Sequence, residues 1–202
     1  MKKLFICILS TVTAIALFTV TALAAVSHTV VRGDTMWKIA VKYEVGLSEI
    51  KSANPEIKNP DRIYPGQVLT VPVRSAAHVS YEEEVVRLVN EVRAERGLAP
   101  LAHDWQLARV ARIKSEDMKD SGYFSHTSPT YGSPFQMIKS FGITYKSAGE
   151  NIAKGYSTPK AVVDGWMNSS GHRANILNSS FTHIGVGYVE DGRYWTQMFI
   201  GK

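Results

Sequence analysis

The chain has 202 residues, of which 45% are hydrophobic and 20% charged, and its formal net charge is +5. This composition is typical of a globular protein and excludes a disordered or low-complexity chain. The positive charge is too small and too dispersed for a nucleic-acid-binding protein, although it suits an anionic surface such as a cell wall.

The first 24 residues have the pattern of a secretory signal peptide. Two lysines precede an uncharged apolar run over 4–20, and the small side chains of Ala-Leu-Ala at 22–24 suit a signal peptidase. We expect cleavage after residue 24. The alternative is an uncleaved membrane anchor, because the run is about as long as the shortest spanning helix. The only cysteine, Cys7, lies in this run, so the mature chain would fold outside the cytosol without disulfides.

Residues 28–73 form the first predicted unit, with the order strand, helix, helix, strand. Asp34 or Thr35 is placed to cap the first helix, and Gly46 is placed to end it. The expected elements are a strand over 28–31, helices over 36–43 and 47–53, and a closing strand over 67–71.

A short polar segment, residues 74–80, connects this unit to a second one over 81–202. An apolar stripe at helical spacing over 81–92 predicts a helix that Gly97 ends. Asp104 is placed to cap a further helix. We expect its inner face to consist of Leu107, Val110, Ala111 and Met118.

The rest of the second unit combines short helices with a late hairpin. At 133–134 and at 158–159 a capping residue is followed by proline, which fits the first position of a helix. Alternating apolar residues on both sides of Asp191-Gly192 predict a hairpin with a two-residue type I′ turn. Helices followed by late strands indicate an α+β layered domain.

The first unit resembles the LysM family over its whole length. The resemblance is carried by Gly-Asp-Thr-Met-Trp-Lys-Ile-Ala over 33–40, by Tyr43 and Asn54, and by Ile-Tyr-Pro-Gly-Gln over 63–67. The latter segment, with Asn-Pro-Asp at 59–61, is similar to LysM modules of spore-coat assembly proteins. Membership implies a βααβ module that binds N-acetylglucosamine glycans, either peptidoglycan or chitin-like chains.

The resemblance places the glycan groove between two loops, where backbone groups pair with the acetamido group and apolar side chains cover the sugar. Each loop residue also has a structural interpretation, since Gly33 fits a turn and Ile63 fits a core. We expect Trp37 to lie in the core or beside the groove. The glycan-binding residues implied are Gly33, Asp34, Thr35, Asn59, Pro60, Ile63 and Tyr64.

The second unit resembles the CAP (cysteine-rich secretory, antigen 5, pathogenesis-related) superfamily in its cysteine-free bacterial form. The strongest matches are Phe-Ser-His at 124–126, Gly-Glu-Asn-Ile-Ala at 149–153, Gly-His-Arg-Ala-Asn-Ile-Leu at 171–177 and Ile-Gly-Val-Gly-Tyr at 184–188. The implied fold is an α–β–α sandwich with a central cleft.

In many CAP proteins two histidines and two acidic residues line this cleft and can hold a divalent metal. Three of these positions match His126, Glu150 and His172. The fourth departs from the pattern, because neutral residues over 168–170 follow Trp166 where an acidic residue is expected. The remaining set is compatible with Zn²⁺ or another divalent ion and an open coordination position, although with weaker binding.

Two functions stay open for this secreted, extracellular chain. In the first, LysM tethers a non-enzymatic protein to the cell wall or spore envelope, and the CAP cleft binds a metal, lipid, glycan or a spore or wall protein. In the second, the chain is a wall-targeted, metal-assisted hydrolase in which His126 or His172 is the general base and Glu150 orients it. The sequence contains no G-x-S-x-G motif. Membrane contact is expected only through an uncleaved signal.

Overall fold

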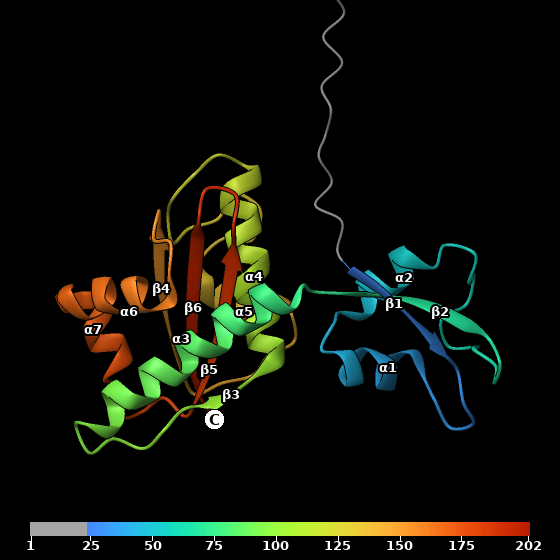
Figure 1. The fold of residues 1–202 in the computed structure, drawn as a ribbon, viewed down its shortest axis with the longest axis horizontal. Helices are drawn as coiled ribbons and strands as arrows, with labels where there is room; N and C mark the ends of the chain where they lie inside the picture. The colour runs from blue at the N-terminus through green and yellow to red at the C-terminus, as the bar shows by residue number, and fades with distance from the viewer. Residues whose placement is uncertain (1–23) are drawn as a thin grey trace, which may run out of the picture.

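The computed structural model describes residues 24–202, so all but the last residue of the predicted signal peptide lies outside the described residues (Figure 1). Within that range no helix is long and apolar enough to cross a membrane. An N-terminal βααβ unit is followed by a four-stranded sheet that carries helices on both faces.

The N-terminal unit has the expected order of elements. They are β1 (Ala24–Thr29), α1 (Met36–Tyr43), α2 (Leu47–Ala53) and β2 (Val68–Val73), with β1 antiparallel to β2. Thr35 caps α1 by accepting the N–H of Lys38. Glu44, in the left-handed region, ends that helix in place of the predicted Gly46, which instead precedes α2. The core of this unit consists of Val30, Met36, Ile39, Ala40, Val45, Ile50, Leu69 and Val71.

The C-terminal sheet has the order β3-β5-β6-β4, in which β3 is parallel to β5 and the other pairs are antiparallel. The strands are β3 (Ala102–His103), β4 (Ser147–Lys154), β5 (His183–Val189) and β6 (Tyr194–Gly201). The helices are α3 (Ala76–Ala94), α4 (Trp105–Asp120), α5 (Pro134–Ser140), α6 (Pro159–Asn168) and α7 (Ser170–Ile176).

Two helical layers cover the sheet, with α4 and α5 on one face and α3, α6 and α7 on the other (Figure 1). Neighbouring residues of β6 serve opposite layers, because strand side chains alternate. Met198 packs in the cluster with α4 and α5, and Phe199 packs in the cluster with α3 and α6. Gly185 and Gly187 let α4 approach β5, since a Cβ at either would lie 2.2 Å from the α4 backbone. The predicted α–β–α sandwich is confirmed.

The connection between the two units is shorter than the predicted segment 74–80. Ser75 accepts the N–H of His78 and caps α3, so the helix begins at Ala76. Only Arg74 and Ser75 remain between β2 and α3. A composition of small and polar residues favours a linker, but the serine cap converts most of it into helix.

Two features of the sheet differ from the sequence prediction. The hairpin forms, but four residues (190–193) separate its strands, with positive φ at Gly192 and Arg193, so the two-residue turn is wrong. β4 was not predicted. Its residues from Gly149 to Ala153 are all buried, so they lack the alternation that identifies a half-exposed strand.

Candidate functional site

The first loop of the LysM-like unit is shaped by three of the predicted glycan-binding residues. Gly33 adopts a φ of 92°, which favours glycine. The carboxylate of Asp34 accepts the N–H of Val31 at 2.9 Å and contacts the ring of His28 at 3.0 Å. These two interactions lower the pKa of Asp34. Thr35 caps α1. The side chains of Asp34 and Thr35 therefore stabilise the loop itself, besides any contact with a ligand.

The second loop leaves one large side chain in solvent. Asn59 accepts the N–H of Asp61, whereas the side chain of Tyr64 is 61% exposed. Ile63 is partly buried against the core of the unit, as its structural interpretation requires, and Pro60 is also partly buried.

The backbone ties the bases of the two loops together. The N–H of Val30 donates to Gln67 O at 2.8 Å, and the N–H of Gly66 donates to Val30 O at 2.9 Å. Glycan binding between these loops stays a prediction at the residue level.

In the CAP-like domain, a histidine contacts a carboxylate in the middle of β4. Nδ1 of His126 lies 2.7 Å from Oε1 of Glu150. The Glu150 side chain is 1% exposed and that of His126 is 52% exposed. His172, on α7, is near enough that burial and the charge of His126 lower its pKa. The three predicted residues therefore gather at one site, where an exposed imidazole is oriented by a buried carboxylate.

A buried lysine below this site was not identified from the sequence. Nζ of Lys114 donates to Tyr123 Oη at 2.9 Å, to Ser125 O at 2.8 Å and to His126 O at 3.1 Å. Burial lowers the pKa of Lys114, and the charge of Glu150 opposes this shift. The available signal was its position on the apolar stripe of α4, three residues after Ala111, where a charge requires partners.

Amide side chains form the rest of the cleft floor. Nδ2 of Asn151 donates to Gln197 Oε1 at 2.9 Å and to His172 O at 3.1 Å, and Asn175 donates to Asn151. Oε2 of Glu150 and Nε2 of Gln197 are buried without a hydrogen-bond partner among the described residues. Since buried polar atoms are normally paired, these two are available to a ligand or water.

The donor set fits a weakly held divalent ion and does not fit a tightly bound structural zinc. If His126 donates Nδ1–H to Glu150, its Nε2 keeps a lone pair, and the carboxylate orients the ring as carboxylates do beside metal-binding histidines. Glu150 therefore contacts His126 through Oε1, and its role as a direct metal ligand stays a prediction. In residues 24–202 no cluster of three or more His, Cys, Asp or Glu is arranged to hold a metal.

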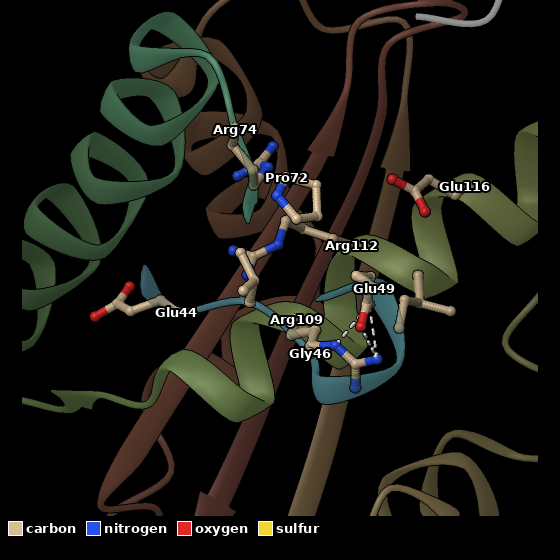
Figure 2. A pocket seen from close by; sticks show the side chains of 10 residues that line it. Glu44, Gly46, Glu49, Pro72, Arg74, Arg109, Arg112 and Glu116 are labelled. Atoms are coloured by element: carbon tan, nitrogen blue, oxygen red, sulfur yellow. Dashed lines mark hydrogen bonds and ion pairs between the residues drawn. The ribbon is translucent and has the colours of Figure 1, made fainter. Parts of the chain in front are cut away.

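An open crevice of about 110 Å³ lies at the junction of the two modules, between α2 and α4 (Figure 2). The arginines that line it are paired with glutamates. Arg109 makes two 2.8 Å hydrogen bonds to Glu49, and both Arg74 and Arg112 bind the buried Glu82. The pair of Arg109 and Glu49 joins α4 to α2 and indicates a role in docking the modules, whereas Arg74 and Arg112 share the single carboxylate of Glu82.

The three-layered fold and the contact between His126 and Glu150, preceded by a separate βααβ module, define a two-module protein of the CAP class. Comparison with family models supports this two-module organisation. The cysteine-rich secretory protein (CAP) family matches residues 86–199 and the LysM domain matches residues 28–72. The first match covers more than half of the chain, which belongs to the CAP family.

Several similar proteins come from Bacillus species. The uncharacterized protein YkwD of Bacillus subtilis is 66% identical over 123 residues, which cover 61% of this chain and 48% of YkwD. A solved extracellular SCP-domain protein of Bacillus anthracis is 38% identical, with a TM-score of 0.60, over 68% of this chain and 47% of that one. The spore coat assembly protein ExsA of Bacillus cereus is 48% identical over 48 residues, 24% of this chain and 8% of ExsA.

This chain spans about half, or less, of the length of these relatives. The predicted resemblances to both families and to spore-coat assembly proteins are confirmed. LysM domains bind N-acetylglucosamine glycans such as peptidoglycan and chitin. Together these similarities support a secreted or wall-associated protein.

Proposed function

We propose that this chain is secreted, that its LysM module binds the N-acetylglucosamine glycan of peptidoglycan, and that the CAP domain is thereby held at the wall. The observation that carries the proposal is the complete LysM module, matched over 28–72, with both predicted binding loops at its surface. The exposed ring of Tyr64 offers a face to the sugar, and the turn at Gly33 lies exposed at the surface of the module.

Co-sedimentation of residues 25–202 with purified peptidoglycan tests this tethering. The wild type is expected in the pellet. The double variant with Tyr64→Ala and Asn59→Ala is expected in the supernatant. Val41→Ala, an exposed position on α1, is the matched control and should sediment like the wild type. A wild type that stays in the supernatant would refute the proposal.

We further propose a role in assembling the wall or the spore envelope, with spore or wall proteins as partners. The support is the 48% identity of a 48-residue segment to a spore coat assembly protein. A fluorescent fusion in sporulating cells is expected to concentrate at the developing spore. Uniform labelling of the vegetative wall would restrict the role to wall assembly.

The cleft is proposed to bind a divalent ion weakly through the imidazoles of His126 and His172. The support is the buried Glu150, which orients the ring of His126. Zinc titration calorimetry on residues 25–202 should show weak one-to-one binding that His126→Ala and His172→Ala each remove. His103→Ala, an exposed histidine outside the cleft, should bind like the wild type. Unchanged binding in both cleft variants would exclude these ligands.

The 2.7 Å contact between His126 and Glu150 also favours the second candidate function, a wall-targeted hydrolase with an oriented general base. For a hydrolase, His126→Ala should abolish release of soluble fragments from peptidoglycan while circular dichroism shows an intact fold. For a binding protein, the wild type releases no fragments, and this is the outcome we expect.

A further inference from the structure

A second, open crevice of about 190 Å³ lies at the junction of the two modules and shares Arg109 and Gly46 with the first. Its walls come from both modules. The LysM module contributes α1 and α2, and the CAP domain contributes α4 and the end of α5. The lining residues that matter here are Trp37, Ser48, Trp105, Gln106, Arg109 and Phe141.

The two tryptophans of this crevice are not used by the hydrophobic cores. Trp37 is 51% exposed on α1, which excludes the core and leaves the other expected place, beside the groove. Trp105 is the first residue of α4 and is partly exposed. Their ring centroids are 6.4 Å apart with the planes tilted by 46°, which is a tilted aromatic contact across the junction. Because Trp37 is half exposed and Trp105 partly exposed, each ring keeps surface for another occupant.

Polar groups stand beside these aromatic faces in fixed positions. The guanidinium of Arg109 is held by Glu49 and by the hydroxyl of Ser48 at 3.0 Å, and it lies 5.2 Å from the centre of the Phe141 ring. The amide side chain of Gln106, one turn earlier on α4, is exposed. A ligand for this crevice has an apolar face for the indoles and hydrogen-bonding groups at its edge.

We propose that this crevice binds a pyranose residue of the wall glycan, so that LysM and CAP share one carbohydrate-binding surface. A pyranose combines an apolar C–H face with polar edge groups, whereas an acyl chain would offer the exposed amide of Gln106 no partner. The inference rests on the proposed glycan binding by LysM, which brings sugar residues to the junction at high effective concentration. The CAP domain then contributes affinity through Trp105.

Intrinsic fluorescence can observe this site selectively. The chain has four tryptophans, and Trp166 and Trp195 are buried in the CAP core. In the Trp37→Phe variant, Trp105 is therefore the single exposed reporter. Titration of residues 25–202 of this variant with the hexamer of N-acetylglucosamine should give a saturating change in emission.

Calorimetry with the same hexamer measures the contribution of Trp105. Trp105→Ala is expected to bind about three- to tenfold more weakly than the wild type, the range for losing one aromatic contact. Phe135→Ala, an exposed aromatic of the CAP domain that does not line the crevice, should bind like the wild type.

The outcomes separate this inference from the proposed function. If calorimetry detects binding while Trp105 emission stays constant and Trp105→Ala binds like the wild type, the shared surface is wrong and LysM binding stands. If the wild type binds neither the hexamer nor peptidoglycan, both are wrong. A variant that loses ellipticity is replaced by Trp105→Leu, which keeps apolar bulk without an aromatic face.

Discussion

The two modules of this chain differ in how many polar side chains they bury. The LysM module buries only two among its described residues, His28 and Asn54, whereas the CAP domain buries a much larger set. That set includes Glu82, Arg93, Lys114, Glu150, Asn151 and Gln197. A module of about 45 residues has too little interior to isolate charges from water, so its chemistry lies on its loops. The three-layered CAP domain can hold charged groups at fixed positions.

Hydrogen-bond completeness distinguishes structural from functional polar groups in the two modules. Asn54 of LysM donates to Ile50 O and Thr70 O and accepts the N–H of Thr70, so it joins α2 to β2 and has its hydrogen bonds satisfied. In the CAP cleft, Glu150 and Gln197 each keep a buried atom that no described residue binds. The comparison indicates that the incomplete network, and not burial alone, marks the candidate site.

The largest effect is expected from the buried lysine of the CAP domain. Lys114→Met keeps the length of the side chain but leaves two backbone carbonyls and the carboxylate of Glu150 without the ammonium. We expect the free energy of unfolding to fall by about 3–5 kcal/mol. Urea denaturation measures this free energy. The control is Lys119→Met, near the end of the same helix, which should change the free energy of unfolding by less than about 1 kcal/mol. Equal effects would show that Lys114 is not an essential partner.

A cavity in the smaller core tests whether the modules unfold separately. Leu69→Ala removes a fully buried side chain of β2 and should cost about 3 kcal/mol. Hydrogen exchange should then accelerate in α1, α2 and β2 while α4 and β6 stay protected. Acceleration in both modules would mean that the junction makes them one cooperative unit.

A smaller effect is expected from the ion pair between Arg109 and Glu49, which joins the two modules. A double-mutant cycle with Arg109→Met and Glu49→Gln should give a coupling energy of about 1 kcal/mol, because the pair is bidentate but partly exposed. A coupling near zero would show that the two modules move independently. Arg87→Met with Glu84→Gln, an exposed pair within α3, is the reference cycle.

The smallest effect is a pH dependence confined to LysM. The hydrogen bond from Val31 and the neighbouring His28 lower the pKa of Asp34 below 3.8. A carboxyl with a lowered folded-state pKa contributes stability above its unfolded pKa, and this contribution is lost as the pH falls through the folded value. Between pH 5 and 2 the wild-type module should therefore lose more stability than Asp34→Asn. Amide hydrogen exchange in α1 measures this loss of stability. Equal losses in the wild type and in Asp34→Asn would contradict the lowered pKa of Asp34.

Much of the fold could be predicted because its signals are local. Thr35, Asp104 and Ser133 each cap the helix that follows, as their side chains suggest, and the inner face expected for α4 is buried. β4 could not be predicted in the same way, because a strand buried on both faces has no alternation and is recognised only by its pairing with β6.

Local sequence by itself determined several helix starts, the two-module organisation and the identities of His126, Glu150 and His172, since caps, periodicity and family motifs are properties of short segments. Only the tertiary structure decided that Lys114 lies beneath the cleft, that Glu150 orients His126, and that Trp37 meets Trp105 across the junction. Each of these contacts joins residues from different elements. The physical reason is that burial and pairing depend on how distant segments pack, which no local pattern contains.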